Sequence, residues 1–293
     1  MLSQIKDALE TAEIAVVVDP GAKEIYQLSK AVTEVVPYSF QASNSPADWA
    51  NLLGILRDRE YEAVLTLTDS WSIGLLLWLS GIPTRVGFGG GANGLFLTDT
   101  VPRKANQPLA QQYGDLLQAI HLPSQLARPS INVPQSDLAA VEALRQTANL
   151  RDGYVLIYPS STATGDSYPV ASWVQILQDF QQRQPTLPVV LVKTPATAAA
   201  LAPIQASLPH LTVLEPETMG QLAALLAGAN LLIGVQGYPL TLAAALGVYA
   251  LELSPAASDL PLLEQDRRVQ VTSSTGKLAD IAPDAVLKKV WSE

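Results

Sequence analysis

The stretch LLIGVQGYPLTLAAALGV, residues 231–248, joins a short apolar run to a longer one through a glycine-containing turn. The first run predicts a buried strand and the second predicts a buried helix. In α/β proteins such a turn commonly binds a phosphate or a nucleotide sugar, because the helix amino terminus offers free backbone N–H groups. The turn itself, residues 234–239, contains no acidic or basic side chain, and the phenol of Tyr238 is its only hydroxyl. The stretch therefore predicts the fold and leaves open whether the turn binds a ligand.

The same alternation of strand and helix extends over the rest of the chain. In the second half, strands are predicted at 154–160, 188–193, 211–215, 230–235 and 249–254, with helices between them. In the first half, strands or extended segments are predicted at 13–20, 32–40, 61–68 and 84–90, and helices at 22–32, 45–59, 71–82 and 106–122. Ser45 and Ser136 are predicted to cap the helices that follow them.

This alternation implies parallel pairing of the strands, with helices on both faces of each sheet. A proline-rich stretch, residues 121–137, interrupts the pattern near the middle of the chain. The sequence therefore predicts an α/β protein with two Rossmann-like, doubly wound domains at residues 1–134 and 135–293. Ligands of such folds bind at the carboxyl ends of the strands.

Composition excludes several classes of function. The formal net charge is −9, which opposes binding to nucleic acid or to an anionic membrane surface. The chain has no cysteine, and its two histidines, His121 and His210, both lie beside loop prolines or near them. We therefore expect no metal site and no cofactor. The start of the chain does not resemble a signal peptide, and the longest apolar stretch, 73–82, is too short to span a bilayer, so a cytoplasmic protein is predicted.

Two loops contain residues that suit phosphate binding. The loop YPSSTATGDSYP, residues 158–169, follows a predicted strand and carries the hydroxyls of Ser160, Ser161 and Thr162. These hydroxyls could bind a diphosphate together with helix N–H groups, or they could serve as ordinary helix caps. The glycine-rich segment 87–94 is not followed by the lysine and hydroxyl residue of a phosphate-binding loop, and we interpret it as a surface loop.

A general base would have to be a carboxylate or a histidine at the end of a strand. Asp19 and Asp69 both end predicted strands of the first half, and Asp69 is the candidate base. No Asp-x-Asp pair occurs in the chain, so a metal-bound diphosphate is not expected. Arg85 and Arg103 could contact an anionic acceptor or simply be solvated.

Two segments resemble glycosyltransferase family 9, the group that contains the lipopolysaccharide heptosyltransferases. The family typically contains Gly-x-Pro-x-Arg-Ile-Gly-Phe after a leucine-rich helix, and this chain has the matching residues Gly81, Pro83, Arg85, Gly87 and Phe88. The segment MGQLAALLAGANLLIG, residues 219–234, is similar to the Leu-x-Glu-Leu-Ala-Ala-Leu-Leu helix of the family's second domain and the strand that follows it.

This resemblance implies the GT-B architecture, with an acceptor-binding first domain and a donor-binding second domain that face a cleft. It implies metal-independent, inverting transfer of a sugar from a nucleotide sugar to a glycan or glycolipid acceptor of the cell envelope, with an ADP-linked sugar as the candidate donor. The donor contacts would then be Ser160, Ser161, Thr162, Gln236, Gly237 and Thr241.

The chain departs from the family pattern at several positions. The family turn is typically Gly-x-Asp-Ser/Thr-Gly-Pro-x-His. This chain has Gln236 in place of the acid, Gly237 in place of the hydroxyl residue, Tyr238 in place of the glycine and Thr241 in place of the histidine. Gly165 or Asp166 lies near the place of a phosphate-binding lysine, and Thr197 lies at the place of an acid. The family's first strand, which is central to its sheet, has no counterpart after Met1, so either the natural chain starts upstream or the catalytic loop has been lost.

Three hypotheses follow. The first is an active family 9 glycosyltransferase with an altered donor site. The second is a catalytically inactive relative that serves as a binding or assembly module and has a protein partner. The third, an epimerase of GT-B shape, lacks support because such enzymes need acidic and histidine groups in the cleft.

Overall fold

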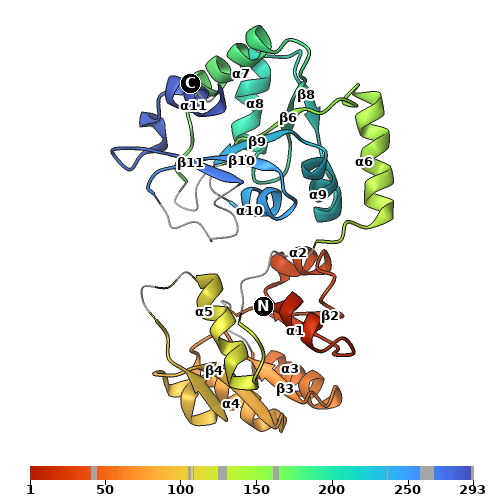
Figure 1. Ribbon diagram of the computed structural model, residues 1–293, viewed down its shortest axis with the longest axis vertical. Coiled ribbons are helices and arrows are strands. Elements are labelled where there is room, and N and C mark those ends of the chain that lie inside the picture. Colours follow the sequence, from red (N-terminus) through yellow and green to blue (C-terminus); the bar gives the residue numbers. More distant parts are fainter. Residues whose placement is uncertain are drawn as a thin grey trace. The chain divides into compact units, whose positions relative to one another are not determined.

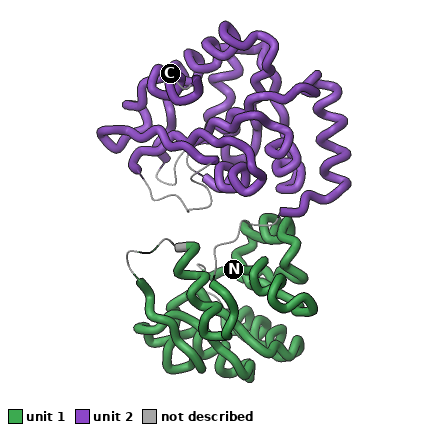
Figure 2. Tube along the Cα trace, in the orientation of Figure 1, with its two compact units in different colours: residues 1–130 green, residues 131–293 purple. Residues whose placement is uncertain are grey.

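The computed structural model describes residues 1–40, 45–104, 107, 109–124, 131–160, 165–235, 237–257 and 267–291. The chain divides into two compact units, residues 1–130 and 131–293 (Figure 2). Both units are built from parallel strands connected by helices, as the alternation in the sequence predicts.

The second unit, residues 131–293, is built around one parallel sheet of six strands in the order β11-β10-β9-β6-β7-β8. The strands are β6 (Val155–Tyr158), β7 (Val189–Val192), β8 (Thr212–Leu214), β9 (Leu231–Val235), β10 (Tyr249–Ser254) and β11 (Arg268–Thr272). The helices are α6 (Gln135–Thr147), α7 (Val170–Arg183), α8 (Ala198–Ser207), α9 (Met219–Ala227), α10 (Tyr238–Ala245) and α11 (Pro283–Trp291), and a short 3-10 helix covers Leu278–Asp280.

Helices cover both faces of this sheet. In Figure 1, α7, α8 and α11 lie together on one side of the sheet, and α9 and α10 lie on the other. The core under α7, α8 and α11 combines alternate strand residues, such as Ile157, Leu191 and Leu253, with Trp173 and Phe180 of α7. Because side chains alternate along a strand, the intervening residues, which include Tyr158 and Glu252, face α9 and α10.

The first unit, residues 1–130, holds its parallel strands in two separate sheets. One pairs β1 (Ala15–Val18) with β2 (Glu34–Pro37), and the other has the order β3-β4-β5. The strands of the second sheet are β3 (Ala63–Leu65), β4 (Thr84–Phe88) and β5 (Asp99–Val101).

The helices of the first unit are short except for two. They are α1 (Leu2–Ala8), α2 (Lys23–Gln27), α3 (Pro46–Asp58), α4 (Trp71–Ser80) and α5 (Leu109–Asp115), with 3-10 helices at Pro20–Ala22, Ala92–Phe96 and Leu116–Ile120. Buried residues of α3 and α4, among them Leu56 and Leu76, pack with Val36 of β2. The partly buried Val17 of β1 and Val64 of β3 pack against the same cluster, so one apolar core serves both sheets.

The two predicted helix caps have different outcomes. Ser45 caps α3, because its Oγ accepts a hydrogen bond from the Asp48 N–H at 3.2 Å, and the Asp48 carboxylate accepts one from the Ser45 N–H at 3.0 Å. The prediction for Ser136 is wrong: α6 begins one residue earlier, at Gln135, and its N-cap is Pro134, which has no side-chain donor or acceptor. A proline at this place fixes φ but leaves the first N–H groups of the helix to other partners.

Candidate functional site

The strand order of the second unit reverses between β6 and β9, which are neighbours in the sheet. The chain runs outward from β6 through β7 to β8, and then returns to β9 and runs outward through β10 to β11. In open parallel sheets the crevice for a ligand lies at the carboxyl ends of the strands where this reversal occurs. The segments that follow β6, β7 and β9 are therefore the candidate site.

Three hydroxyl groups meet at this place. The Tyr158 Oη atom, at the end of β6, lies 3.2 Å from Thr194 Oγ1, which follows β7, and 3.5 Å from Tyr238 Oη, at the start of α10. The rings of Tyr158 and Tyr238 meet edge to face, with centroids 6.5 Å apart. We call Tyr158, Thr194 and Tyr238 the hydroxyl cluster. It can donate and accept hydrogen bonds, but it carries no charge.

The two glycines of the β9–α10 turn, Gly234 and Gly237, differ in how much space their surroundings leave for a side chain. A Cβ atom on Gly234 would lie 3.1 Å from the Tyr158 carbonyl oxygen, a tight contact that would require β6 and β9 to shift slightly. Gly237 is the N-cap of α10 and has extended backbone, with φ 164°. A Cβ atom on Gly237 would make ordinary contacts, at 3.5 Å to Pro239 Cδ and 3.8 Å to the Val235 carbonyl oxygen. The packing is therefore tight at the first glycine, and there is room for a side chain at the second.

Ser160, among the predicted donor contacts that the structure describes, has a buried side chain without a hydrogen-bond partner. Its side chain is in the loop that follows β6, the residue is only 7% exposed, and its Oγ has no hydrogen-bond partner within the described parts of the chain. Buried polar groups are nearly always hydrogen-bonded, so a hydroxyl of this kind implies a water molecule or a ligand. Ser161, Thr162 and Gln236, which were also predicted as donor contacts, lie outside the described residues.

Thr241 has a protein partner. It is in the first half of α10, and its Oγ1 accepts a hydrogen bond from Nη1 of Arg268 at 3.1 Å. Arg268 is itself bonded to Glu252 of β10, through Nε at 2.9 Å. Sequence reasoning missed both charged residues. The available signal was an acid within the apolar strand YALELS, where alternation turns Glu252 toward α10.

Thr197, at the family's acidic position, is fully buried and closes the turn between β7 and α8. Its Oγ1 donates to the Val192 carbonyl oxygen at 2.8 Å and accepts from the Thr194 N–H at 2.8 Å. The hydroxyl therefore stabilises the loop that carries Thr194 of the hydroxyl cluster. Next to it, Lys193 forms an exposed ion pair with Glu215, with Nζ 2.7 Å from Oε2.

Asp69, the candidate base, lies in the first unit between β3 and α4. Both of its carboxylate oxygens accept hydrogen bonds from Nη2 of Arg103, at 3.2 Å to Oδ1 and 3.0 Å to Oδ2. The guanidinium group of Arg103 also lies over the ring of Phe88, 4.4 Å from its centroid. Both side chains of the ion pair are about half exposed, at 55% for Asp69 and 40% for Arg103. An acceptor hydroxyl would have to compete with Arg103 for these oxygens.

The other candidate groups of the first unit have structural partners. Asp19 Oδ1 accepts a hydrogen bond from the Phe40 N–H at 3.2 Å. The interpretation of residues 87–94 as a surface loop is wrong for much of the segment, because Gly87 and Phe88 belong to β4 and the Ala92–Phe96 helix packs on α4. Asn93, in the middle of that helix, is 1% exposed and donates from Nδ2 to the Thr68 carbonyl oxygen at 3.1 Å.

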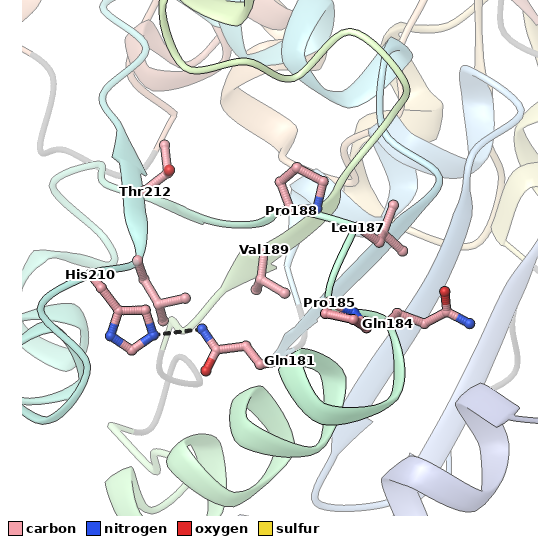
Figure 3. Close-up of a pocket in the computed structure, with 9 residues that line it drawn as sticks. Gln181, Gln184, Pro185, Leu187, Pro188, Val189, His210 and Thr212 are labelled. Atoms are coloured by element: carbon pink, nitrogen blue, oxygen red, sulfur yellow. Dashed lines mark hydrogen bonds between the residues drawn. The ribbon is translucent and has the colours of Figure 1, made fainter.

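The second unit also has an open hollow of about 290 Å³ beside His210 (Figure 3). Gln181 and His210 lie within hydrogen-bond distance of each other, 2.6 Å between the two Nε2 atoms. Val189 and Thr212, which also line the hollow, are the first residues of β7 and β8. The hollow is therefore at the amino edge of the sheet, opposite the edge that carries the hydroxyl cluster.

The described residues contain neither a helix that could span a membrane nor a cluster of metal-binding side chains. None of the helices there is both long and apolar enough to cross a membrane. Nor do three or more histidine, aspartate or glutamate side chains of the described ranges gather in a group that could hold a metal ion.

Solved structures show which fold the chain has. A family 9 glycosyl transferase from Veillonella parvula has a TM-score of 0.85 at 14% identity, and the match covers 99% of this chain and 91% of that one. The ADP-heptose lipopolysaccharide heptosyltransferase II of E. coli has a TM-score of 0.77 at 18% identity, covering 99% and 92%. The E. coli heptosyltransferase WaaC with ADP-2-deoxy-2-fluoro heptose has a TM-score of 0.78 at 16% identity, covering 99% and 93%. At these identities the likeness establishes the fold, which is GT-B.

Sequence comparison gives the family. No curated protein sequence matches the chain. The model of glycosyltransferase family 9 (heptosyltransferase) matches residues 49–253, which is more than half of the chain and includes both Asp69 and the β9–α10 turn. The resemblance noted in the sequence is thus confirmed, and the chain belongs to glycosyltransferase family 9.

Proposed function

We propose that this chain transfers a sugar from a nucleotide sugar to a glycan or glycolipid acceptor of the cell envelope, with inversion and without a metal. The observation that carries the proposal is the buried, unpartnered hydroxyl of Ser160 at the strand reversal of the second unit. A ligand with phosphate oxygens would satisfy such a hydroxyl. Support also comes from the relatives: two solved structures of E. coli WaaC are described with ADP or an ADP-linked sugar.

In this proposal the second domain, residues 135–293, binds the donor. The diphosphate of the donor accepts hydrogen bonds from the hydroxyls of the 158–169 loop and from the first N–H groups of α10. The donor contacts are Ser160, Ser161, Thr162, Gln236, Gly237 and Thr241. An ADP-linked sugar is the first donor to test, and the first domain, residues 1–134, binds the acceptor.

Asp69 is proposed as the base. Its carboxylate takes the proton of the acceptor hydroxyl, and the acceptor oxygen attacks the anomeric carbon. The nucleoside diphosphate leaves from the opposite face of the sugar with the bonding electrons, so the configuration at that carbon is inverted. For this step Arg103 must give up at least one of its two hydrogen bonds to the carboxylate.

A second candidate function is a binding or assembly module without catalysis, which has a protein partner. The pairing of Asp69 with Arg103 favours it, because the candidate base is already engaged. The commitment of Thr197 to the β7–α8 turn favours it too, because this position offers a ligand no charged group.

Calorimetric titration of the full chain with ADP, UDP, GDP and their sugar conjugates tests the donor site. Micromolar binding of one nucleotide supports a donor site, and absence of binding at millimolar ligand contradicts it and favours the module. Release of nucleoside diphosphate from the bound sugar conjugate in the presence of a glycan or glycolipid acceptor then tests catalysis. Asp69→Asn should reduce this rate by about 100-fold or more, as loss of a general base does. Asp99→Asn, which changes an exposed acid of β5 in the same unit, should leave the rate unchanged.

A further inference from the structure

A nucleoside diphosphate brings several negative charges to the candidate site. The hydroxyl cluster there contains no positively charged group. Charge-assisted hydrogen bonds from lysine or arginine are the usual partners of phosphate oxygens. Two described cations of the second unit near this sheet already have acidic partners. Lys193 is paired with Glu215 at 2.7 Å, and Arg268 with Glu252 at 2.9 Å.

A third cation, Lys277, follows the carboxyl end of β11. The loop between them is held in shape by Ser273, whose Oγ accepts hydrogen bonds from the Thr275 N–H at 3.1 Å and the Lys277 N–H at 3.2 Å. Gly276 allows the turn, with φ +85°. The backbone of Lys277 is therefore fixed by the loop, while its side chain is exposed.

The segment after Lys277 is tied to the loop that carries Ser160. The N–H of Leu278 donates to Asp166 Oδ2 at 2.8 Å, and Tyr168 Oη donates to the Ile281 carbonyl oxygen at 3.0 Å. Tyr168 is buried, at 3% exposure, so this contact is a stable part of the core. Two hydrogen bonds thus bring the chain next to Lys277 against the end of the 158–169 loop.

The ammonium group of Lys277 makes no ion pair with any residue that the structure describes. Asp280, the next acid along the chain, accepts a hydrogen bond from the Thr275 hydroxyl. We propose that Lys277 supplies the positive charge that binds the phosphate groups of the donor, from a loop different from the one that carries the hydroxyls. This inference rests on the proposed donor site and names a residue of it.

The test compares a nucleoside diphosphate with its nucleoside. The full chain, as wild type, Lys277→Ala, Lys277→Arg and Lys289→Ala, is titrated with ADP and with adenosine, or with the corresponding pair if UDP or GDP binds more tightly. Lys289 is an exposed lysine of α11 in the same unit and serves as the matched control. Thermal unfolding of each variant checks that the fold is kept.

Lys277→Ala should weaken binding of the diphosphate roughly 10- to 100-fold, the range for a lost charge-assisted hydrogen bond. It should leave adenosine binding unchanged, Lys277→Arg should retain most of the affinity, and Lys289→Ala should have no effect. Equal diphosphate affinity of Lys277→Ala and wild type would overturn this inference and leave the proposed function standing. Failure of the wild type to bind any of the three nucleotides would overturn both.

Discussion

Glu252 and Arg268 form an ion pair inside the second unit, with Nη2 of Arg268 2.9 Å from Oε2 of Glu252. Their side chains are 0% and 9% exposed. Gln270 donates a further hydrogen bond to the same oxygen at 2.9 Å, and Arg268 donates to Thr241 of α10 at 3.1 Å. The pair thus connects β10, β11 and the helix that begins at the candidate site.

Removing one partner of this pair should be costly, because it leaves a charge buried without compensation. Arg268→Met should lower the free energy of unfolding by roughly 3–5 kcal/mol. The double variant Arg268→Met with Glu252→Gln should recover much of the loss, since no buried charge remains. Urea unfolding of the single and double variants measures both values.

The exposed pair Lys193–Glu215 provides the control. Its side chains are 43% and 62% exposed, so Lys193→Met should cost less than about 1 kcal/mol. A loss of similar size for Arg268→Met would show that the buried pair contributes no more than a surface pair.

Thr197 should respond to the loss of its hydroxyl and not to the loss of a methyl group. Thr197→Val keeps the shape but leaves the Thr194 N–H and the Val192 carbonyl without this partner, so we expect a loss of about 1–3 kcal/mol. Thr197→Ser keeps the hydroxyl and should cost less than half as much. Thr197→Glu, which introduces the acid typical of the family, buries a carboxylate and should be the least stable of the three. Thermal unfolding ranks the variants, and a Glu variant as stable as wild type would contradict the argument.

The two glycines of the β9–α10 turn should differ in their tolerance of serine. Gly234→Ser places Cβ 3.1 Å from the Tyr158 carbonyl oxygen in the centre of the sheet, and should cost about 1–3 kcal/mol. Gly237→Ser has room, and serine is at least as good an N-cap as glycine, so stability should change by less than about 0.5 kcal/mol. Urea unfolding compares them, and equal losses would mean that contact with β6 does not decide the choice of residue.

Tyr154 should make the protein sensitive to alkaline pH. Burial raises the pKa of Tyr154 to about 12, while its Oη donates to the Leu225 carbonyl oxygen at 2.6 Å. The unfolded chain releases this proton near pH 10, so the unfolded state binds fewer protons than the folded state between pH 10 and 12. The contribution of Tyr154 to the free energy of unfolding is therefore constant below pH 10. Above pH 10 it falls by about 1 kcal/mol per pH unit.

Tyr154→Phe should remove that dependence. At pH 8 the variant loses the hydrogen bond to Leu225 and should be about 1 kcal/mol less stable than wild type. The two curves should cross near pH 11, and by pH 12 the variant should be the more stable protein by about 1 kcal/mol, because only the wild type loses stability through this group. Urea unfolding at pH 8, 10, 11 and 12 gives the comparison, and parallel curves would contradict the assignment. Tyr168, whose pKa burial also raises to about 12, remains in both proteins and affects them equally.

The sequence predicts the second unit well because its strands β6 to β10 are apolar runs separated by short, clearly marked turns. The turn between β9 and α10, with Gly234 and Pro239, lies where it was expected. Two strands were missed. β5 is only three residues long and mostly exposed, and β11 mixes charged and apolar residues, so neither has a local signal. Each exists because a neighbouring strand pairs with it.

The site was harder to predict because its contacts join distant parts of the chain. The sequence places Thr241 in the turn region, but nothing local indicates that Arg268, 27 residues later, donates to its hydroxyl. The same holds for Asp69 and Arg103, which are 34 residues apart. The hydroxyl of Ser160 was predicted as a candidate from its loop, but its burial without a partner became visible only in the structure.

The division of the first unit into two sheets affects how its backbone exchanges hydrogen with water. β1 and β3 each pair with one described strand, so a local opening of that single pairing exposes their amides. β6 and β9 have a paired strand on both sides, and their amides exchange only when the larger sheet opens. The amides of β1 and β3 are therefore expected to exchange fast, although valines of both strands pack in an apolar core. The strands that carry the candidate donor site are expected to exchange most slowly.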